Sequence, residues 1–305
     1  MTTERPTTVA YIGATGRSGS TLLARVLGAS PSACSVGELC WIWNYGLISD
    51  RPCGCGEPFH SCPFWSEVGD AAFGGWSNID APALNQVRRD LVSTKALPSL
   101  WRRGIGADPR LPDYAQTLAT LYDAISRVSG APVVVDNSKQ VPAALVAAMA
   151  PGIDLRLVHL VRSVHGVAYS WVKHVRREDM GGEEMRRRPP ARTALRWSVD
   201  NAMFERMAAR GLPRLVVHYD DFVADARRQT VRVLDFLSVP DPDPSFVGPD
   251  WAEFQTEHSV WGNPIRDRTG RQEIRKDDGW RSGLSRFDRA LVSTVAAPAI
   301  RRYAD

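Results

Sequence analysis

Apolar residues along this chain follow two alternating patterns. Short apolar runs rich in β-branched residues predict strands at 9–12, 131–136, 155–161 and 212–217. Apolar residues at helical spacing follow these runs or fill the stretches between them. They predict helices from Leu22 onward and over 80–97, 111–128, 141–149, 164–175 and 222–237. Because strands alternate with helices, the pattern indicates βαβ units, and therefore an α/β fold with a parallel sheet flanked by helices on both faces.

The first predicted strand and helix enclose the most informative motif. Residues 9–28, VAYIGATGRSGSTLLARVLG, give a strand, a turn of glycine, serine and threonine, and a helix. A helix N-terminus offers unpaired backbone N–H groups and the positive end of its dipole, so this turn is typical of a phosphate-binding loop. The expected phosphate ligands are the guanidinium of Arg17 and the backbone N–H groups and hydroxyls of Ser18, Gly19, Ser20 and Thr21. A purely structural alternative is that Ser20 caps the helix.

This loop departs from the G-x-x-x-x-G-K-[ST] pattern of nucleotide triphosphatases. Ser20 follows Gly19 where that pattern has lysine, and the cation, Arg17, comes two residues before Gly19. The sequence therefore predicts a phosphate site that is unsuited to Mg²⁺-ATP.

Further polar groups follow other predicted strands. Asn137–Lys139 come after the run 131–136, and Arg162 and Ser163 come after the run 155–161. In a parallel sheet the carboxyl ends of the strands share one edge, where ligands gather. We therefore expect these groups to meet the Arg17–Thr21 loop at one site.

Composition limits the classes of function. With 305 residues, 44% of them hydrophobic, and a formal net charge of +4, the chain can bury a sizeable core and is not expected to bind nucleic acid through a general basic surface. No leader-like N-terminus and no apolar run of about 18 residues is present, so we expect a cytoplasmic protein without a membrane span. The charged stretch 176–192 is expected to be an exposed loop, either ordering over a ligand or merely solvated.

All five cysteines lie between Cys34 and Cys62. The segment Cys53-Gly-Cys55-Gly-Glu-Pro-Phe-His60-Ser-Cys62 could hold zinc, but its C-x-C spacing is tighter than the usual C-x₂₋₄-C. Free or structural thiols, a metal site and a local disulfide all stay open, and no metal is expected among the site residues.

Taken in order, these motifs resemble those of the sulfotransferases. Residues 16–31, GRSGSTLLARVLGASP, followed by Val36-Gly37-Glu38, are similar to the family's 5′-phosphosulfate loop in its tyrosylprotein and bacterial small-molecule branches. Val161-Arg162 through Tyr169-Ser170 is similar to the 3′-phosphate motif, and Asp136–Lys139 to the lysine-bearing strand end of the tyrosylprotein branch. Segments 258–266 and 274–280 are similar to the late segment of bacterial members.

The resemblance implies a three-layer, P-loop NTPase-like α/β fold formed by a single domain over residues 1–305. It also implies 3′-phosphoadenosine 5′-phosphosulfate (PAPS) as the sulfate donor, adenosine 3′,5′-bisphosphate (PAP) as the product, and no requirement for metal. The loop Arg17–Thr21 would bind the 5′-phosphosulfate, and Arg162 and Ser170 the 3′-phosphate. Of the late cluster Arg266, Arg268, Arg271 and Arg275, expected to close over the nucleotide, Arg275 fits the family's basic contact best.

Sulfuryl transfer needs stabilised charge on the transferring oxygens and the leaving phosphate, and removal of the acceptor's proton. Arg17 is expected to supply the first, and Lys139 a donor near the bridging oxygen. Glu38 is the expected general base, matching the Gly-Glu pair of the tyrosylprotein branch. His60 and His174 are alternative bases, and His159, inside an apolar run, is expected to be core. We expect Trp41, Trp43 and Trp65 near the base to line an acceptor pocket, or to fill core.

The leading hypothesis is a PAPS-dependent sulfotransferase acting on a hydroxyl of a small-molecule or glycan-like acceptor. Two alternatives stay open: a P-loop kinase with an aberrant loop, and a non-catalytic nucleotide-binding module that keeps the fold. The first alternative requires Mg²⁺-ATP binding, against which the missing Gly-Lys pair argues.

Overall fold

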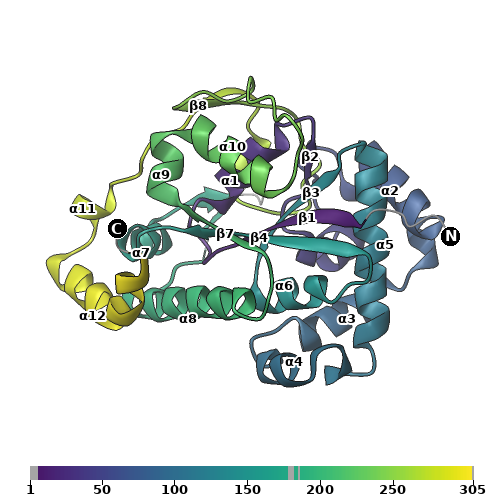
Figure 1. Cartoon of the computed structure of the whole chain (residues 1–305), viewed down its shortest axis with the longest axis horizontal. Coiled ribbons are helices and arrows are strands. Elements are labelled where there is room, and N and C mark those ends of the chain that lie inside the picture. The colour runs from purple at the N-terminus through teal and green to yellow at the C-terminus, as the bar shows by residue number, and fades with distance from the viewer. Residues whose placement is uncertain (1–5, 178–181, 185, 304–305) are drawn as a thin grey trace.

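A five-stranded parallel sheet forms the centre of the molecule (Figure 1). The structure, a computed structural model, describes residues 6–177, 182–184 and 186–303. The strands lie in the order β2-β3-β1-β4-β7. Their bounds are β1 Thr7–Gly13, β2 Ala33–Ser35, β3 Val133–Lys139, β4 Ile153–Val161 and β7 Arg214–His218. The four strands expected from the apolar runs are present, and β2 is an additional short one.

The central strand β1 shows why both faces of the sheet are covered. Successive side chains of a strand point to opposite faces. Val9 and Tyr11 belong to one buried apolar cluster, and Ala10 and Ile12 to another, each with no exposed surface. A continuous buried run is what a parallel sheet between two helical layers requires, and the expected three-layer α/β fold is confirmed.

Helices from distant parts of the chain form the two outer layers. One layer contains α1, α9 and α10, drawn above the sheet in Figure 1, and the other contains α5, α6 and α8. The bounds of these helices are α1 Ser20–Gly28, α5 Leu111–Ser129, α6 Val141–Ala148, α8 Pro190–Ala208, α9 Tyr219–Ala224 and α10 Ala226–Phe236.

The carboxyl side of the sheet carries a third apolar cluster. It joins α8 to α7 and to the C-terminal helices, through residues that include Val167, Trp197 and Val292. The bounds are α7 Val164–Val172, α11 Trp280–Gly283 and α12 Arg286–Tyr303. The antiparallel hairpin of β8 (Trp251–Phe254) and β9 (Gly270–Glu273) packs on the α1 layer, with Phe254 in its core.

Three predicted helices differ from the observed ones in their bounds. The prediction over 222–237 covers α10 and only the last three residues of α9. The two helices are separate because the helix ends before Asp225, whose carboxylate caps α10 by accepting from the Arg228 N–H. The prediction over 80–97 covers α3, Ala81–Leu91, and only the first residue of α4, Leu97–Arg103. The prediction over 164–175 is α7, which ends at Val172.

Two stretches outside the predicted strands and helices contain regular structure. The region 30–75 holds β2, a π-helix over Ile42–Ile48 and the helix α2, Pro63–Phe73. The stretch 176–192, expected to be an exposed loop, pairs β5 Arg176–Arg177 with β6 Glu183–Glu184, and α8 begins inside it. Residues 178–181 and 185 of that stretch lie outside the described residues.

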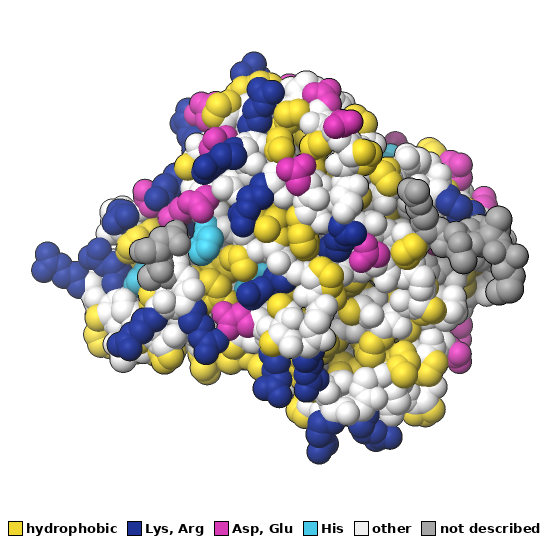
Figure 2. Space-filling view, viewed as in Figure 1, with side chains coloured by type: hydrophobic (Ala, Val, Ile, Leu, Met, Phe, Trp, Pro, Cys, Tyr) yellow, Lys and Arg dark blue, Asp and Glu magenta, His cyan; other side chains and the backbone are white. Residues whose placement is uncertain are grey.

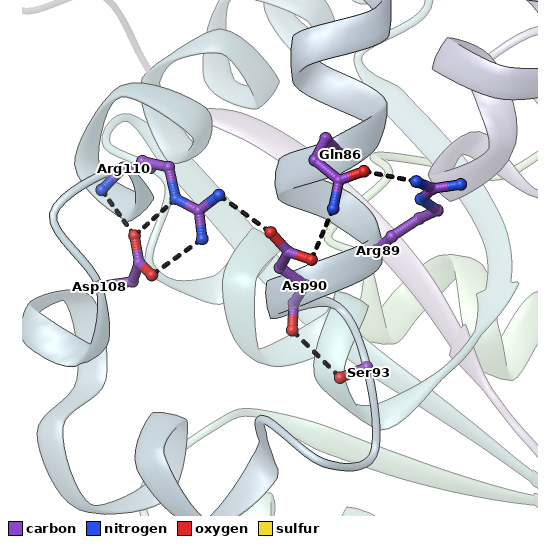
Figure 3. Close-up of polar contacts among 6 residues, drawn as sticks. All are labelled: Gln86, Arg89, Asp90, Ser93, Asp108 and Arg110. Carbon is purple, nitrogen blue, oxygen red and sulfur yellow. Dashed lines mark hydrogen bonds and ion pairs between the residues drawn. The ribbon is translucent and has the colours of Figure 1, made fainter.

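Charged side chains of both signs cover the surface. Figure 2 shows basic and acidic groups interspersed on one face, with basic ones most frequent at its left and lower edges. Remote from the sheet's carboxyl edge, Arg110 pairs with Asp108 and Asp90 and so ties the start of α5 to α3, as Figure 3 shows. Among the helices within the described residues, none combines the length and apolar character of a membrane span.

Candidate functional site

A cavity of about 470 Å³ opens at the carboxyl edge of the sheet. Its walls come from the loop after β1, the ends of β3 and β4, helix α7, and the segments around residues 261–265 and 277. Eight of the predicted site residues line it: Arg17, Gly19, Ser20, Thr21, Glu38, Lys139, Arg162 and Ser170. The strand-end rule therefore located this site from the sequence.

The loop after β1 has a backbone shape that depends on Gly19. This residue is the N-cap of α1, with φ 91°, and a Cβ there would lie 2.7 Å from the ring of Tyr219. Helix α1 begins at Ser20, so the capping role considered for Ser20 is wrong. The first N–H groups of a helix have no partner within it, and Ser20, Thr21 and Leu22 of this first turn line the cavity.

Arg17 is held beside this helix terminus. Its backbone has φ 76°, in the left-handed region, and its guanidinium lies 5.3 Å from the ring centre of Trp171. The Trp171 indole N–H in turn donates to the Gly16 carbonyl at 2.9 Å. Trp171 therefore supports both the backbone of the loop and the guanidinium of Arg17.

Glu38 and Lys139 form an ion pair across the cavity wall. The Lys139 Nζ lies 2.6 Å from the Glu38 Oε1, and each side chain is only 14% exposed. The indole of Trp41 donates to the other oxygen, Glu38 Oε2, at 3.3 Å. The expected base and the expected cationic donor thus lie in contact with each other at the cavity.

The end of β3 fixes where this pair lies. Predicted to end at Asp136, the strand continues through Lys139, which itself has φ 65°. Asp136 is buried and accepts from the backbone and hydroxyl of Ser138 and from the hydroxyl of Tyr122. Burial raises the pKa of the Asp136 carboxyl, and these hydrogen bonds oppose the rise. The Ser138 hydroxyl accepts from the Cys40 N–H at 2.9 Å, which anchors the segment after Glu38.

Asn137 links the same strand end to the phosphate loop. Its amide donates to the Thr21 hydroxyl at 3.4 Å, and its backbone N–H donates to the Gly37 carbonyl at 2.8 Å. Gly37 has φ 72°, and a Cβ there would lie 2.6 Å from the Trp261 carbonyl. The glycine beside Glu38 therefore serves close packing between three segments.

Arg162 forms a second cationic group in the cavity. It is 7% exposed, its guanidinium stacks 4.4 Å from the ring centre of Tyr219, and it donates to the Arg17 carbonyl at 3.3 Å. Ser170, eight residues later on α7, lines the same cavity. Both members of the expected arginine–serine pair thus face one space.

In the structure, the guanidinium of Arg162 is paired with the carboxylate of Asp277. Its carboxylate lies 3.2 Å from an Arg162 nitrogen and 3.1 Å from the Lys173 Nζ. Burial raises the pKa of Asp277, but hydrogen bonds from Lys173 and Arg162 outweigh burial and lower it. The Asp277 carboxylate is therefore an anion of the protein itself that lies between the cations of Arg162 and Lys173 at the cavity wall.

Several predicted contributors lie outside the cavity. Ser18 is buried, and its N–H donates to the Thr15 carbonyl. Arg275 is 77% exposed and pairs with Glu273, and its nucleotide contact stays a prediction. Arg266 is buried and donates to the carbonyls of Pro52 and Val260, so it holds chain segments together.

The expected aromatic and histidine groups are distributed differently. Trp43 and Trp65 are buried and donate to the Tyr114 hydroxyl and the His258 carbonyl, so they fill core. Neither His60 nor His174 lines the cavity: the first bonds the Leu47 carbonyl and the second pairs with Glu184. His159 is buried in β4 as expected.

Sequence reasoning missed several residues of the cavity wall. Tyr219 could have been found, because it lies two residues after the strand predicted at 212–217, and directly after β7, and so obeys the strand-end rule. The sequence pattern did not single out Trp171 or Asp277, whose positions depend on long-range packing. Trp261, Gly262, Asn263 and Ile265 also line the cavity and fall in or beside the late motif.

The fold is α/β, and one cavity at the carboxyl edge of its sheet holds two cationic groups and a carboxylate–lysine pair. The sequence matches the model of the Sulfotransferase family over residues 10–243, which is most of the chain. The chain belongs to the sulfotransferase family, and sulfuryl transfer is the activity that this membership supports. A search of curated protein sequences found no match.

One solved structure shares the fold of this chain, and a second aligns over a similar length. A sulfotransferase domain from the curacin biosynthetic pathway aligns over 97% of this chain and 98% of that one, with a TM-score of 0.55 and 17% identity. A sulfotransferase domain from the Synechococcus PCC 7002 olefin synthase aligns over 97% of each chain, with a TM-score of 0.45 and 20% identity. At these identities the likeness concerns the fold.

Proposed function

We propose that this protein transfers the sulfuryl group of PAPS to a hydroxyl of a small-molecule or glycan-like acceptor, and that residues 1–305 act as one domain in doing so. The observation that carries the proposal is that two cationic groups, the Arg17 loop and Arg162 with Ser170, line a single cavity. A donor phosphorylated at both its 3′ and 5′ positions requires such a pair of sites.

The residues present fit the two anionic ends of this donor. The N–H groups at the start of α1, the hydroxyls of Ser20 and Thr21, and Arg17 suit the 5′-phosphosulfate. Arg162 and Ser170 suit the 3′-phosphate, with Lys173 close by through Asp277.

The reaction forms a bond from the acceptor oxygen to sulfur and breaks the bond from sulfur to the bridging oxygen of the 5′-phosphate. Glu38 takes the proton of the acceptor hydroxyl. Lys139 keeps one N–H on Glu38 and directs another at the bridging oxygen, where negative charge grows, because an ammonium group has three donors. PAP and the sulfated acceptor are the products.

Aromatic side chains beside Glu38 support the acceptor class. Tyr45 lies with its ring centre 5.2 Å from that of Trp41 and 4.2 Å from that of Trp261. Of these three rings, that of Trp261 lines the cavity, and an aromatic wall next to a base favours an acceptor with a flat or weakly polar face, such as a sugar ring or a small organic alcohol.

Calorimetry tests the two-site donor model. Without Mg²⁺, PAP should bind far more tightly than AMP, because only PAP uses Arg162 and Ser170. Arg162→Ala should remove most of that preference, whereas Arg127→Ala, on the exposed face of α5, should keep it. Equal affinity for PAP and AMP in the wild-type protein would refute the model, and tight Mg²⁺-dependent ATP binding would favour the kinase alternative.

A further inference from the structure

Three cysteines and a histidine converge at a place separate from the cavity. The ligand atoms of Cys53, Cys55, Cys62 and His258 all lie within 4.8 Å of one another. The Cys62 Sγ is 3.7 Å from each of the other two sulfurs, and the His258 Nδ1 is 3.2 Å from the Cys62 Sγ and 3.9 Å from the Cys53 Sγ. None of these four residues lines the cavity.

These separations agree with tetrahedral zinc. With Zn–S near ~2.3 Å and Zn–N near ~2.0 Å, tetrahedral angles give S···S of ~3.8 Å and S···N of ~3.5 Å. The two sulfur–sulfur distances from Cys62 match the first value, and the two sulfur–nitrogen distances fall on either side of the second. A disulfide is not formed, since all five cysteines are free and Cys62 lies equally far from both other sulfurs.

The backbone between the first two cysteines is shaped for this close approach. The Cys53 N–H donates to the Glu57 carbonyl at 2.8 Å, and the Gly56 N–H to the Cys53 carbonyl at 2.9 Å, which folds the segment into a tight turn. Gly56 has φ 93°, which favours glycine. A Cβ on Gly54 would lie 2.6 Å from the Glu257 carbonyl, so glycine here allows the segment to pack against the chain before His258.

The histidine ring is held in place by its own neighbours. It stacks on Phe64 with ring centres 4.8 Å apart and an interplanar angle of 14°, and the His258 carbonyl accepts from the Trp65 indole at 3.0 Å. Both aromatic residues lie on α2, which begins one residue after Cys62. Helix α2 therefore fixes the orientation of the His258 ring, although His258 is far from this helix in the sequence.

We propose that Cys53, Cys55, Cys62 and His258 form a structural zinc site. Thiolate and imidazole ligands in this number suit Zn²⁺, and four protein ligands leave no open position for catalysis. Two of the sulfurs, on Cys53 and Cys62, belong to buried residues, as a closed site requires. The C-x-C spacing of Cys53 and Cys55 is unusual for zinc. It is compatible with this site because the fourth ligand, His258, lies 196 residues beyond Cys62, so the fold and not a local motif brings the four ligands together.

The zinc site would hold in place the part of the cavity wall that follows His258. From His258 the chain runs directly to Trp261, whose carbonyl accepts from the Glu38 N–H at 3.0 Å, and to Asn263 at the cavity. The Val260 N–H donates to the Val36 carbonyl at 3.0 Å. A zinc ion would thus tie the cysteine segment to the segment that packs against the proposed base.

Metal analysis of the full-length protein tests the proposal. Protein purified without chelators and analysed by mass spectrometry of its elements should contain about one zinc per chain. Cys62→Ser and His258→Gln should lose the metal. Matched controls are Cys34→Ser, a cysteine outside the cluster, and His60→Gln, whose ring bonds the Leu47 carbonyl. Both controls should keep it.

A second measurement needs no variant and so does not depend on their folding. Wild-type protein reconstituted with Co²⁺ should show the intense visible bands of a tetrahedral thiolate site. Absence of those bands, together with zinc-free protein, would overturn the proposal, as would a count of three rather than five thiols in unfolded, unreduced protein. These readouts are independent of sulfuryl transfer, so the zinc proposal and the proposed function can fail separately.

Discussion

The two cations nearest the proposed reaction, Arg17 and Lys139, both have left-handed backbone conformations, with φ of 76° and 65°. Such a conformation costs a non-glycine residue about 1–3 kcal/mol and persists only where the surroundings enforce it. Here Trp171 supports the first residue, and the ion pair with Glu38 engages the second. Strain at two neighbouring cations is consistent with selection for their placement rather than for stability.

Replacement of the proposed base tests its role directly. Glu38→Gln keeps the size of the side chain and can still accept from Lys139, but it cannot take a proton. We expect turnover with PAPS and an acceptor to fall by about 10²–10⁴-fold, with PAP affinity unchanged. Steady-state kinetics and calorimetry measure the two quantities. Glu67→Gln, on the exposed face of α2, is the matched control, and full activity of Glu38→Gln would assign proton removal to another group.

His159 makes folding stability depend on pH. Its Nε2 faces the Asn201 Oδ1 at 2.8 Å and its Nδ1 faces Arg214, a donor, so the buried ring is neutral with its proton on Nε2. Burial lowers the pKa of His159 to about 4. The unfolded chain, with a pKa near ~6.5, binds a proton more readily, so stability is lost as pH falls from ~6.5 to ~4.

The size of this loss is about 3 kcal/mol, from the difference between the two pKa values. Urea unfolding of the wild-type protein at pH 7 and at pH 4.5 should show it. His159→Gln should flatten this part of the profile, whereas His60→Gln, with its exposed ring, should leave the profile as in the wild type. Identical profiles for wild type and His159→Gln would contradict the assignment.

At the scale of elements, local patterns located the core of the site and long-range contacts supplied the rest. The loop after β1 and the ends of β3 and β4 follow apolar runs, so their convergence could be predicted. Helix α8 was not predicted, because polar residues interrupt its apolar stripe: its buried face holds Thr193, Asp200 and Asn201 beside apolar side chains. The break at Asp225 is set by a cap, which apolar spacing does not report.

The segment carrying Asp277 affects the second cationic group. Its carboxylate pairs with Arg162 where the 3′-phosphate of the donor is proposed to bind, so the two anions would repel each other. We expect Asp277→Asn to strengthen PAP binding about fivefold, or about 1 kcal/mol, and to leave AMP binding unchanged. Calorimetry measures both affinities.

The neighbouring Asp278→Asn is the matched control, since Asp278 pairs with Lys276 and Arg281 rather than with Arg162. Weaker PAP binding by Asp277→Asn would mean that this carboxylate mainly holds Arg162 in position.

At the scale of the whole molecule, the site is assembled from parts of the chain that are far apart in sequence. The walls run from Gly16 to Asp277, and the pairing of His258 with Cys53 and Cys62 joins the last third of the chain to the first. A single sequence shows which residues carry chemistry, but it does not show that His258 would meet these cysteines. Spacing rules apply to ligands close in sequence, and this ligand is close only in the fold.

Removal of the proposed zinc should therefore affect both stability and the remote cavity. A strong chelator should lower the melting temperature of the wild-type protein by more than about 5 °C, because metal binding contributes to folding free energy. PAP affinity should fall as well, since Trp261 and Asn263 lose their anchor at His258. Cys34→Ser should respond as the wild type does, and Cys62→Ser should not respond further. A lower melting temperature with unchanged PAP affinity would restrict the metal to stabilising the fold, independently of the cavity wall.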